Sequence, residues 1–180
     1  MTGTKQWLLV CLIGITIADS WRLAFAATSA QIPTDHLRTG SVVIATLMQQ
    51  ASERSHTFQG LVDAINASDG IVYVEEGTCA QGMRACFINV TMAGTHRILW
   101  VKVDTRGVDC DLMGLIGHEL RHTVEVLADA KVTGFATMYN FYSREADPGG
   151  TFPFETIEAK RAGEAVRTEV RHKSSCAKIR

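Results

Sequence analysis

The sequence predicts an α+β fold: a small mixed or antiparallel sheet packed on a central helix and followed by C-terminal helices. Apolar residues recur at helical spacing before residue 68, and β-branched segments bounded by turn residues lie between residues 71 and 104. Helical spacing returns from residue 111 onwards. A sheet that lies against the helix beginning near residue 111 would form the two layers of an α+β domain.

The individual elements follow from the same patterns. Gly94-Thr95 marks a turn that joins the last two strands as an antiparallel hairpin, and Asp147-Pro148-Gly149-Gly150 marks a loop at 143–153. In the helix before that loop, four apolar residues are expected to face inward: Val132, Phe135, Met138 and Tyr139. The predicted elements are helices at 41–52 and 57–67, strands at 71–75, 85–91 and 97–104, and helices at 111–128, 131–142 and 155–172.

Residues 1–26 have the features of a secretory signal peptide. Lys5 precedes a nearly unbroken apolar run from Trp7 to Ala18, and Ala24-Phe25-Ala26 matches the small-x-small cleavage pattern. The alternative is an N-terminal anchor that is not cleaved. From the signal-peptide features we predict one domain at 27–180 that is secreted or periplasmic, without stable membrane insertion after signal cleavage.

Charge and cysteine content narrow the possible partners. A formal net charge of −1 gives no electrostatic argument for binding nucleic acid or an anionic membrane, so no nucleic acid partner is expected. Four of the five cysteines lie beyond the predicted signal peptide, as expected in an oxidising compartment. Among three possible pairings we favour Cys79–Cys86 and Cys110–Cys176, with Cys110 as a metal ligand the alternative.

The predicted helix at 111–128 contains an H-E-x-x-H motif at residues 118–122. His118 and His122 are four residues apart, so their imidazoles share one helix face and can reach one metal ion. Glu119 is rotated by about 100° from His118, which suits a carboxylate that contacts metal-activated water without binding the metal. The alternative is a pair of core histidines without a metal.

A catalytic zinc usually takes three protein ligands and one water, so a further ligand is required. Glu155, in the expected first turn of the last helix, is preferred because the apolar segment 152–154 can fix its position. Glu158, one turn later, is the alternative. Glu125 lies about 10.5 Å along the helix axis from His118, so we interpret it as a carboxylate that supports the site or packs the helix.

The H-E-x-x-H motif with a glutamate on a separate downstream helix resembles the gluzincin branch of zinc metallopeptidases, and also a group of small exported bacterial proteins with the same layout. The resemblance implies a zincin-like fold, a Zn²⁺ ion on His118, His122 and Glu155, and a peptide or protein substrate. It also implies that Glu119 is the general base. Tyr142, Tyr139 and Arg121 are candidates for the donor that stabilises the oxyanion, and Tyr142 is preferred.

The peptidase prediction also implies a strand that binds the substrate, and two other hypotheses compete with it. A strand beside the motif helix would bind substrate by strand addition, and the strand at 97–104 is the candidate. One competing hypothesis is a catalytically silent zinc-binding interaction or structural protein of the cell envelope. The other is a metal-free domain held together by disulfides.

Overall fold

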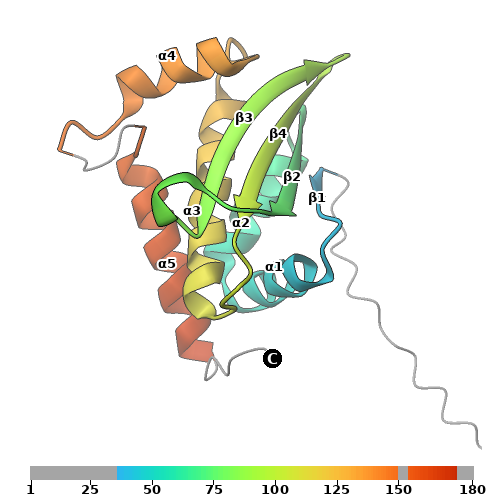
Figure 1. Cartoon of the computed structure of the whole chain (residues 1–180), viewed down its shortest axis with the longest axis vertical. Helices are drawn as coiled ribbons and strands as arrows, with labels where there is room; N and C mark the ends of the chain where they lie inside the picture. The colour runs from blue at the N-terminus through green and yellow to red at the C-terminus, as the bar shows by residue number, and fades with distance from the viewer. Residues whose placement is uncertain (1–35, 150–153, 174–180) are drawn as a thin grey trace, which may run out of the picture.

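The computed structural model describes residues 36–149 and 154–173, and its elements follow the predicted order (Figure 1). The predicted α+β class is confirmed. Two short elements, β1 and a 3₁₀ turn at Ala80–Gly82, were not predicted. The helices are α1 (Val42–Arg54), α2 (His56–Asn66), α3 (Cys110–Ala128), α4 (Phe135–Glu145) and α5 (Ile157–Lys173), and the strands are β1 (Leu37–Arg38), β2 (Gly70–Glu76), β3 (Ala85–Ala93) and β4 (His96–Val103).

The four strands form a mixed sheet in the order β1-β2-β4-β3. β2 is parallel to both β1 and β4, whereas β3 and β4 form the predicted antiparallel hairpin. The prediction that the strand at 97–104 is the substrate-binding edge is therefore wrong, because β4 pairs on both sides. The edge strand near α3 is β3, which has a bulge between Phe87 and Asn89.

One face of the sheet packs against helices. Val72, Val74, Leu99 and Val101 alternate with more exposed residues along their strands, and all four are fully buried. Helices α1, α2 and α3 cover this face, as Figure 1 shows. The alternation along β2 and β4 is thus that of a sheet with one buried face.

Helices α3 and α5 lie side by side and pack closely (Figure 1). Gly114 of α3 faces Gly163 of α5: a Cβ at Gly114 would lie 2.9 Å from the Gly163 carbonyl oxygen. A Cβ at Gly117 would lie 2.8 Å from Val166. The missing side chains let the two backbones approach each other, and this approach brings the segment before α5 to the motif helix.

The bounds of two predicted helices need correction. The helix predicted at 131–142 begins at Phe135 and continues to Glu145, so the predicted loop at 143–153 begins later. Val132 and Met138 are buried as predicted, but Phe135 and Tyr139 are 62% and 49% exposed. The last helix begins at Ile157, so Glu155 precedes it and does not lie in its first turn.

The cysteine prediction is confirmed in part. Cys79 and Cys86 form the predicted disulfide, which closes the loop between β2 and β3. Cys110 also takes part in a disulfide, which argues against a metal-ligand role; its predicted partner, Cys176, lies outside the described residues. The predicted signal peptide at 1–26 lies outside them as well. Of the helices that the structure describes, none has the length and apolar character needed to span a membrane.

Candidate metal centre

The motif residues lie on α3, whose start is defined by the sequence. Asp109 is the N-cap, and its carboxylate accepts a hydrogen bond from the Leu112 amide at 2.8 Å. The helix then runs without interruption past the motif, so His118 and His122 lie one turn apart. Their ring centroids are 4.9 Å apart in an edge-to-face arrangement. Both rings therefore lie on the same side of α3, as the motif predicted.

Glu155 reaches the two imidazoles from the turn before α5. Phe154 has a positive φ of 75°, a conformation that a bulky residue rarely adopts, and it turns the chain sharply. On the other side Thr156 caps α5 by accepting a hydrogen bond from the Ala159 amide at 3.1 Å. The Asp147 amide donates to the Glu155 carbonyl oxygen at 2.8 Å. The position of Glu155 is thus fixed by a hydrogen bond to its own carbonyl oxygen and by the capped start of α5 next to it.

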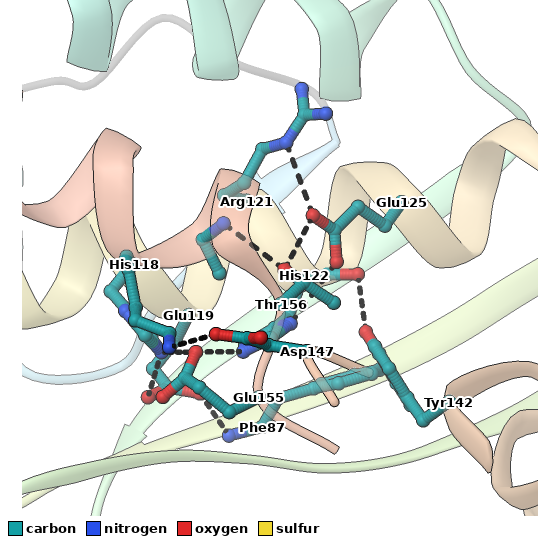
Figure 2. Close-up of polar contacts among 12 residues, drawn as sticks. Phe87, His118, Glu119, Arg121, His122, Glu125, Tyr142, Asp147, Glu155 and Thr156 are labelled. Carbon is teal, nitrogen blue, oxygen red and sulfur yellow. Dashed lines mark hydrogen bonds and ion pairs between the residues drawn. The ribbon is translucent and has the colours of Figure 1, made fainter. Parts of the chain in front are cut away.

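Figure 2 shows His118, His122 and Glu155 converging. One potential ligand atom from each lies within 4.8 Å of the other two. Oε1 of Glu155 is 3.3 Å from Nε2 of His118 and 3.7 Å from Nε2 of His122. This oxygen is buried and has no hydrogen-bond partner. Two imidazole nitrogens and a carboxylate oxygen in this arrangement match the ligands of a catalytic zinc site, so the group can hold a metal ion.

Glu119 lies beside the three potential ligands and is almost fully buried. Its Oε2 accepts a hydrogen bond from the backbone amide of Phe87 on β3 at 2.6 Å. Its Oε1 is 3.9 Å from Nε2 of His118. Burial raises the pKa of Glu119 to about 7, although His122 and the Phe87 amide act in the opposite direction. A carboxyl group with this pKa exchanges protons readily near neutral pH.

Glu125 supports the site from behind, as predicted. Its Oε2 lies 3.2 Å from Nδ1 of His122, and its Oε1 accepts from Thr156 at 2.9 Å and from Arg121 at 3.3 Å. A carboxylate on one ring nitrogen fixes the orientation of the ring and leaves the other nitrogen for a metal. Arg121, a candidate oxyanion donor, is engaged in this pair.

Burial and the neighbouring charged groups shift the pKa values of the two imidazoles in opposite directions. Burial opposes protonation of His122, but Glu125 and Glu155 raise its pKa to about 9. Burial and the neighbouring His122 lower the pKa of His118. Burial acts to raise the pKa of Glu155, but the neighbouring His122 and His118 outweigh burial and lower this pKa. The pocket thus concentrates negative charge around the histidines, which favours a bound cation.

A cavity of about 220 Å³ opens onto these residues. Met83 and Phe87 line it from the sheet side, and Phe135 and Tyr139 from α4. Tyr142 also lines it, but this side chain is 3% exposed and its hydroxyl donates to the His122 carbonyl at 2.9 Å. In this structure Tyr142 supports the backbone of the motif helix, and its hydroxyl hydrogen is not directed at the three potential ligands.

The remaining sequence candidates lie elsewhere. Glu158 is exposed and pairs with Arg161 at 3.4 Å, away from the three converging residues. Thr156 and the Phe87 amide were not predicted. Thr156 could have been recognised from the sequence, since a threonine just before a helical segment is a favoured N-cap. The contact from the Phe87 amide could not, because any residue offers a backbone amide.

The fold and the site define an α+β domain with a His-His-Glu group suited to a metal ion. Comparison of the chain with known protein families, with curated proteins and with solved structures finds no match.

Proposed function

We propose that the chain is a zinc-dependent peptidase of the gluzincin type. His118, His122 and Glu155 would hold the ion, and Glu119 would act as general base. The observation that carries the proposal is the convergence of the three potential ligands in an open cavity, with a second, hydrogen-bonded carboxylate, that of Glu119, beside them. No residue outside this group is required to complete a three-ligand site.

Zinc held by His118, His122 and Glu155 would supply Lewis-acid chemistry: it would polarise the scissile carbonyl and lower the pKa of water towards neutrality. Glu119 then takes the proton from the attacking water and returns it to the leaving amine. Burial, which raises the pKa of this carboxyl group before any metal binds, makes it a stronger base than an exposed glutamate. The Phe87 amide holds the carboxylate in place at 2.6 Å.

The proposed substrate is a peptide or an unfolded segment of a protein. β3 borders the cavity and is one of the two edge strands of the described sheet, so a peptide chain can pair with it. For the oxyanion, Tyr142 is a candidate if its hydroxyl leaves the His122 carbonyl, and half-exposed Tyr139 is the other. The disulfide agrees with a secreted or periplasmic location.

Metal analysis of matched variants tests the site. Purified protein is expected to carry about one zinc per chain. Glu155→Ala should lose most of it, whereas Glu158→Ala, a matched change at an exposed carboxylate three residues later, should keep it. Equal zinc in both variants would remove Glu155 from the site.

Activity against a broad peptide library tests the reaction. Glu119→Gln keeps the shape of the side chain but removes the base, so we expect roughly 10²- to 10⁴-fold slower hydrolysis with unchanged zinc content. A zinc-replete wild-type protein without hydrolysis would instead support the second candidate, a catalytically silent metal-binding protein. That candidate is favoured by one observation: one carboxylate oxygen of Glu119 and the hydroxyl of Tyr142 are both engaged within the protein.

A further inference from the structure

Helix α4 presents aromatic side chains to the cavity instead of burying them. Phe135 and Tyr139 both line it, with 62% and 49% of their surface exposed. Across the cavity lie Met83, which is 39% exposed, and Phe87 of β3. Large apolar residues gathered on both sides of an open hollow indicate a surface that binds something.

The rest of the fold holds in place the aromatic wall formed by Phe135 and Tyr139. Tyr139 packs edge-to-face on Phe154 with ring centroids 5.1 Å apart, and Phe154 adjoins the proposed ligand Glu155. Met138 and Tyr142 are buried and hold α4 against the rest of the fold. On the other side the Cys79–Cys86 disulfide constrains the loop that carries Met83. Both walls are therefore formed before any ligand arrives, which lowers the entropic cost of binding.

The charge of the cavity limits what can enter. Among the described lining residues, the only acids and bases besides two tyrosines are His118, Glu119, His122 and Glu155. These four are committed to the metal and the base in the proposed function. Away from the metal, a charged side chain lying between the two apolar walls would find no partner among the described lining residues and would lose its hydration, which costs several kcal/mol.

The size of the cavity points to a single side chain. Its volume of about 220 Å³ lies below the roughly 300–1,000 Å³ of small-molecule sites. The outer edge of β3 can hold the main chain of a peptide in extended form, except at the Phe87 amide, which donates to Glu119. A peptide lying there would direct one side chain between β3 and α4.

We propose that the cavity selects peptides with one aromatic or long aliphatic side chain, held between Phe135 and Tyr139 on α4 and Met83 and Phe87 on the other wall. This assignment names the substrate class of the proposed peptidase and rests on that function for cleavage. Recognition itself does not require cleavage, so the two can be tested separately.

The test uses full-length, zinc-loaded Glu119→Gln protein, which binds without hydrolysis. Its affinity is measured by fluorescence anisotropy for peptides that differ at one central position: Phe, Leu, Ala, Asp or Lys. We expect the Phe and Leu peptides to bind at least tenfold more tightly than the others. Adding Tyr139→Ala should reduce this preference severalfold, whereas adding Val42→Ala, which truncates an 81% exposed side chain on α1 outside the cavity and away from β3, should leave it unchanged.

A second variant keeps the test decisive if Tyr139→Ala unfolds the protein. Phe135→Lys changes a 62% exposed residue that tolerates a charge, and it should improve binding of the Asp peptide relative to the Phe peptide. Equal binding of all five peptides, or an unchanged preference in both variants, would overturn the assignment. Selective binding without hydrolysis by the wild type would support it and contradict the proposed peptidase function.

Discussion

At the scale of single residues, Glu125 has the clearest role outside the three potential ligands. It contacts Nδ1 of His122 at 3.2 Å and accepts a hydrogen bond from Thr156, the cap of α5. Carboxylates in this position raise ligand basicity and fix ring orientation. We predict that Glu125→Gln weakens zinc binding by about 10- to 100-fold, as measured by competition with a chelator of known affinity.

Glu145→Gln is the matched control for this prediction. Glu145 and Glu125 both line a second cavity, separate from the one at His118, His122 and Glu155, but Glu145 is exposed and lies on α4. Its replacement removes an equal charge at a position without a contact to His122, so zinc affinity should change little. If both variants lost affinity to the same extent, the effect would reflect overall charge and not the Glu125–His122 contact.

The sequence could predict those site residues that act through their side chains at characteristic spacings. His118 and His122 follow from the helical period, and Glu155 from its acidic side chain beside an apolar segment. The sharp turn at Phe154 could not be predicted, because nothing local favours a positive φ at a phenylalanine. Tertiary contacts hold that turn, so only the folded chain reveals it.

At the scale of elements, the approach of α5 to α3 depends on glycine. A methyl group at Gly114 would lie 2.9 Å from the Gly163 carbonyl oxygen, a backbone atom that can move only with its helix. We predict that Gly114→Ala lowers the free energy of unfolding by about 1–3 kcal/mol despite its higher helix propensity. Chemical denaturation monitored by circular dichroism measures this change.

The same substitution at Gly60 should have the opposite sign. Gly60 lies inside α2, and a Cβ built there meets no atom within 4 Å. Alanine should therefore stabilise α2 by about 0.5–1 kcal/mol through its helix propensity alone. A stabilising effect at both positions would mean that α3 and α5 are not packed through their glycines.

A second contact between elements involves Arg97 of β4, which is buried. Its guanidinium donates to Asp69, just before β2, and to the carbonyl oxygens of Val126 and Leu127 at the end of α3. The hydrogen bond from Arg97 holds the pKa of Asp69 below its ordinary value of 3.8. This contact thus joins two strands to the C-terminus of the motif helix.

The lowered pKa makes the contact sensitive to acid. Since Asp69 binds its proton less readily in the folded state, its contribution to stability is complete above the ordinary pKa of 3.8 and is lost as pH falls through the lowered value. We predict that Asp69→Asn destabilises the protein by about 1–2 kcal/mol at pH 7, a range reduced for partial exposure. Denaturation from pH 7 to pH 2 should show the difference from wild type shrinking. A constant difference would contradict the ionic contribution.

The helices and strands themselves could largely be predicted, but the order of the strands in the sheet could not. Period 2 in β2 and β4 and period 3.6 in α3 follow from which faces are buried. The strand order was not predictable, because parallel pairing of β2 with β4 leaves β3 at the edge although it comes between them in the sequence. For α4, Phe135 and Tyr139 were wrongly predicted to be buried, because apolar residues that line an open cavity have the same helical spacing as those of a core face.

At the scale of the whole molecule, the candidate site joins parts of the fold that are distant in sequence. His118 and His122 come from α3, Glu155 precedes α5, and the Phe87 amide that holds Glu119 comes from β3 (Figure 2). A metal ion bound there would link α3 to the segment before α5. Because the unfolded chain lacks this arrangement, binding should stabilise the folded state specifically.

This linkage gives a prediction for thermal unfolding. Zinc at about 100 times its dissociation constant should stabilise the protein by about 2.7 kcal/mol, which corresponds to a rise in Tm of roughly 5–10 °C for a chain of this size. A chelator should reverse the shift, and calorimetry measures both. Glu155→Ala should show a much smaller rise, whereas Glu158→Ala should respond as the wild type does. An equal rise in all three proteins would mean that zinc binds elsewhere, and no rise in any would exclude a metal site of useful affinity.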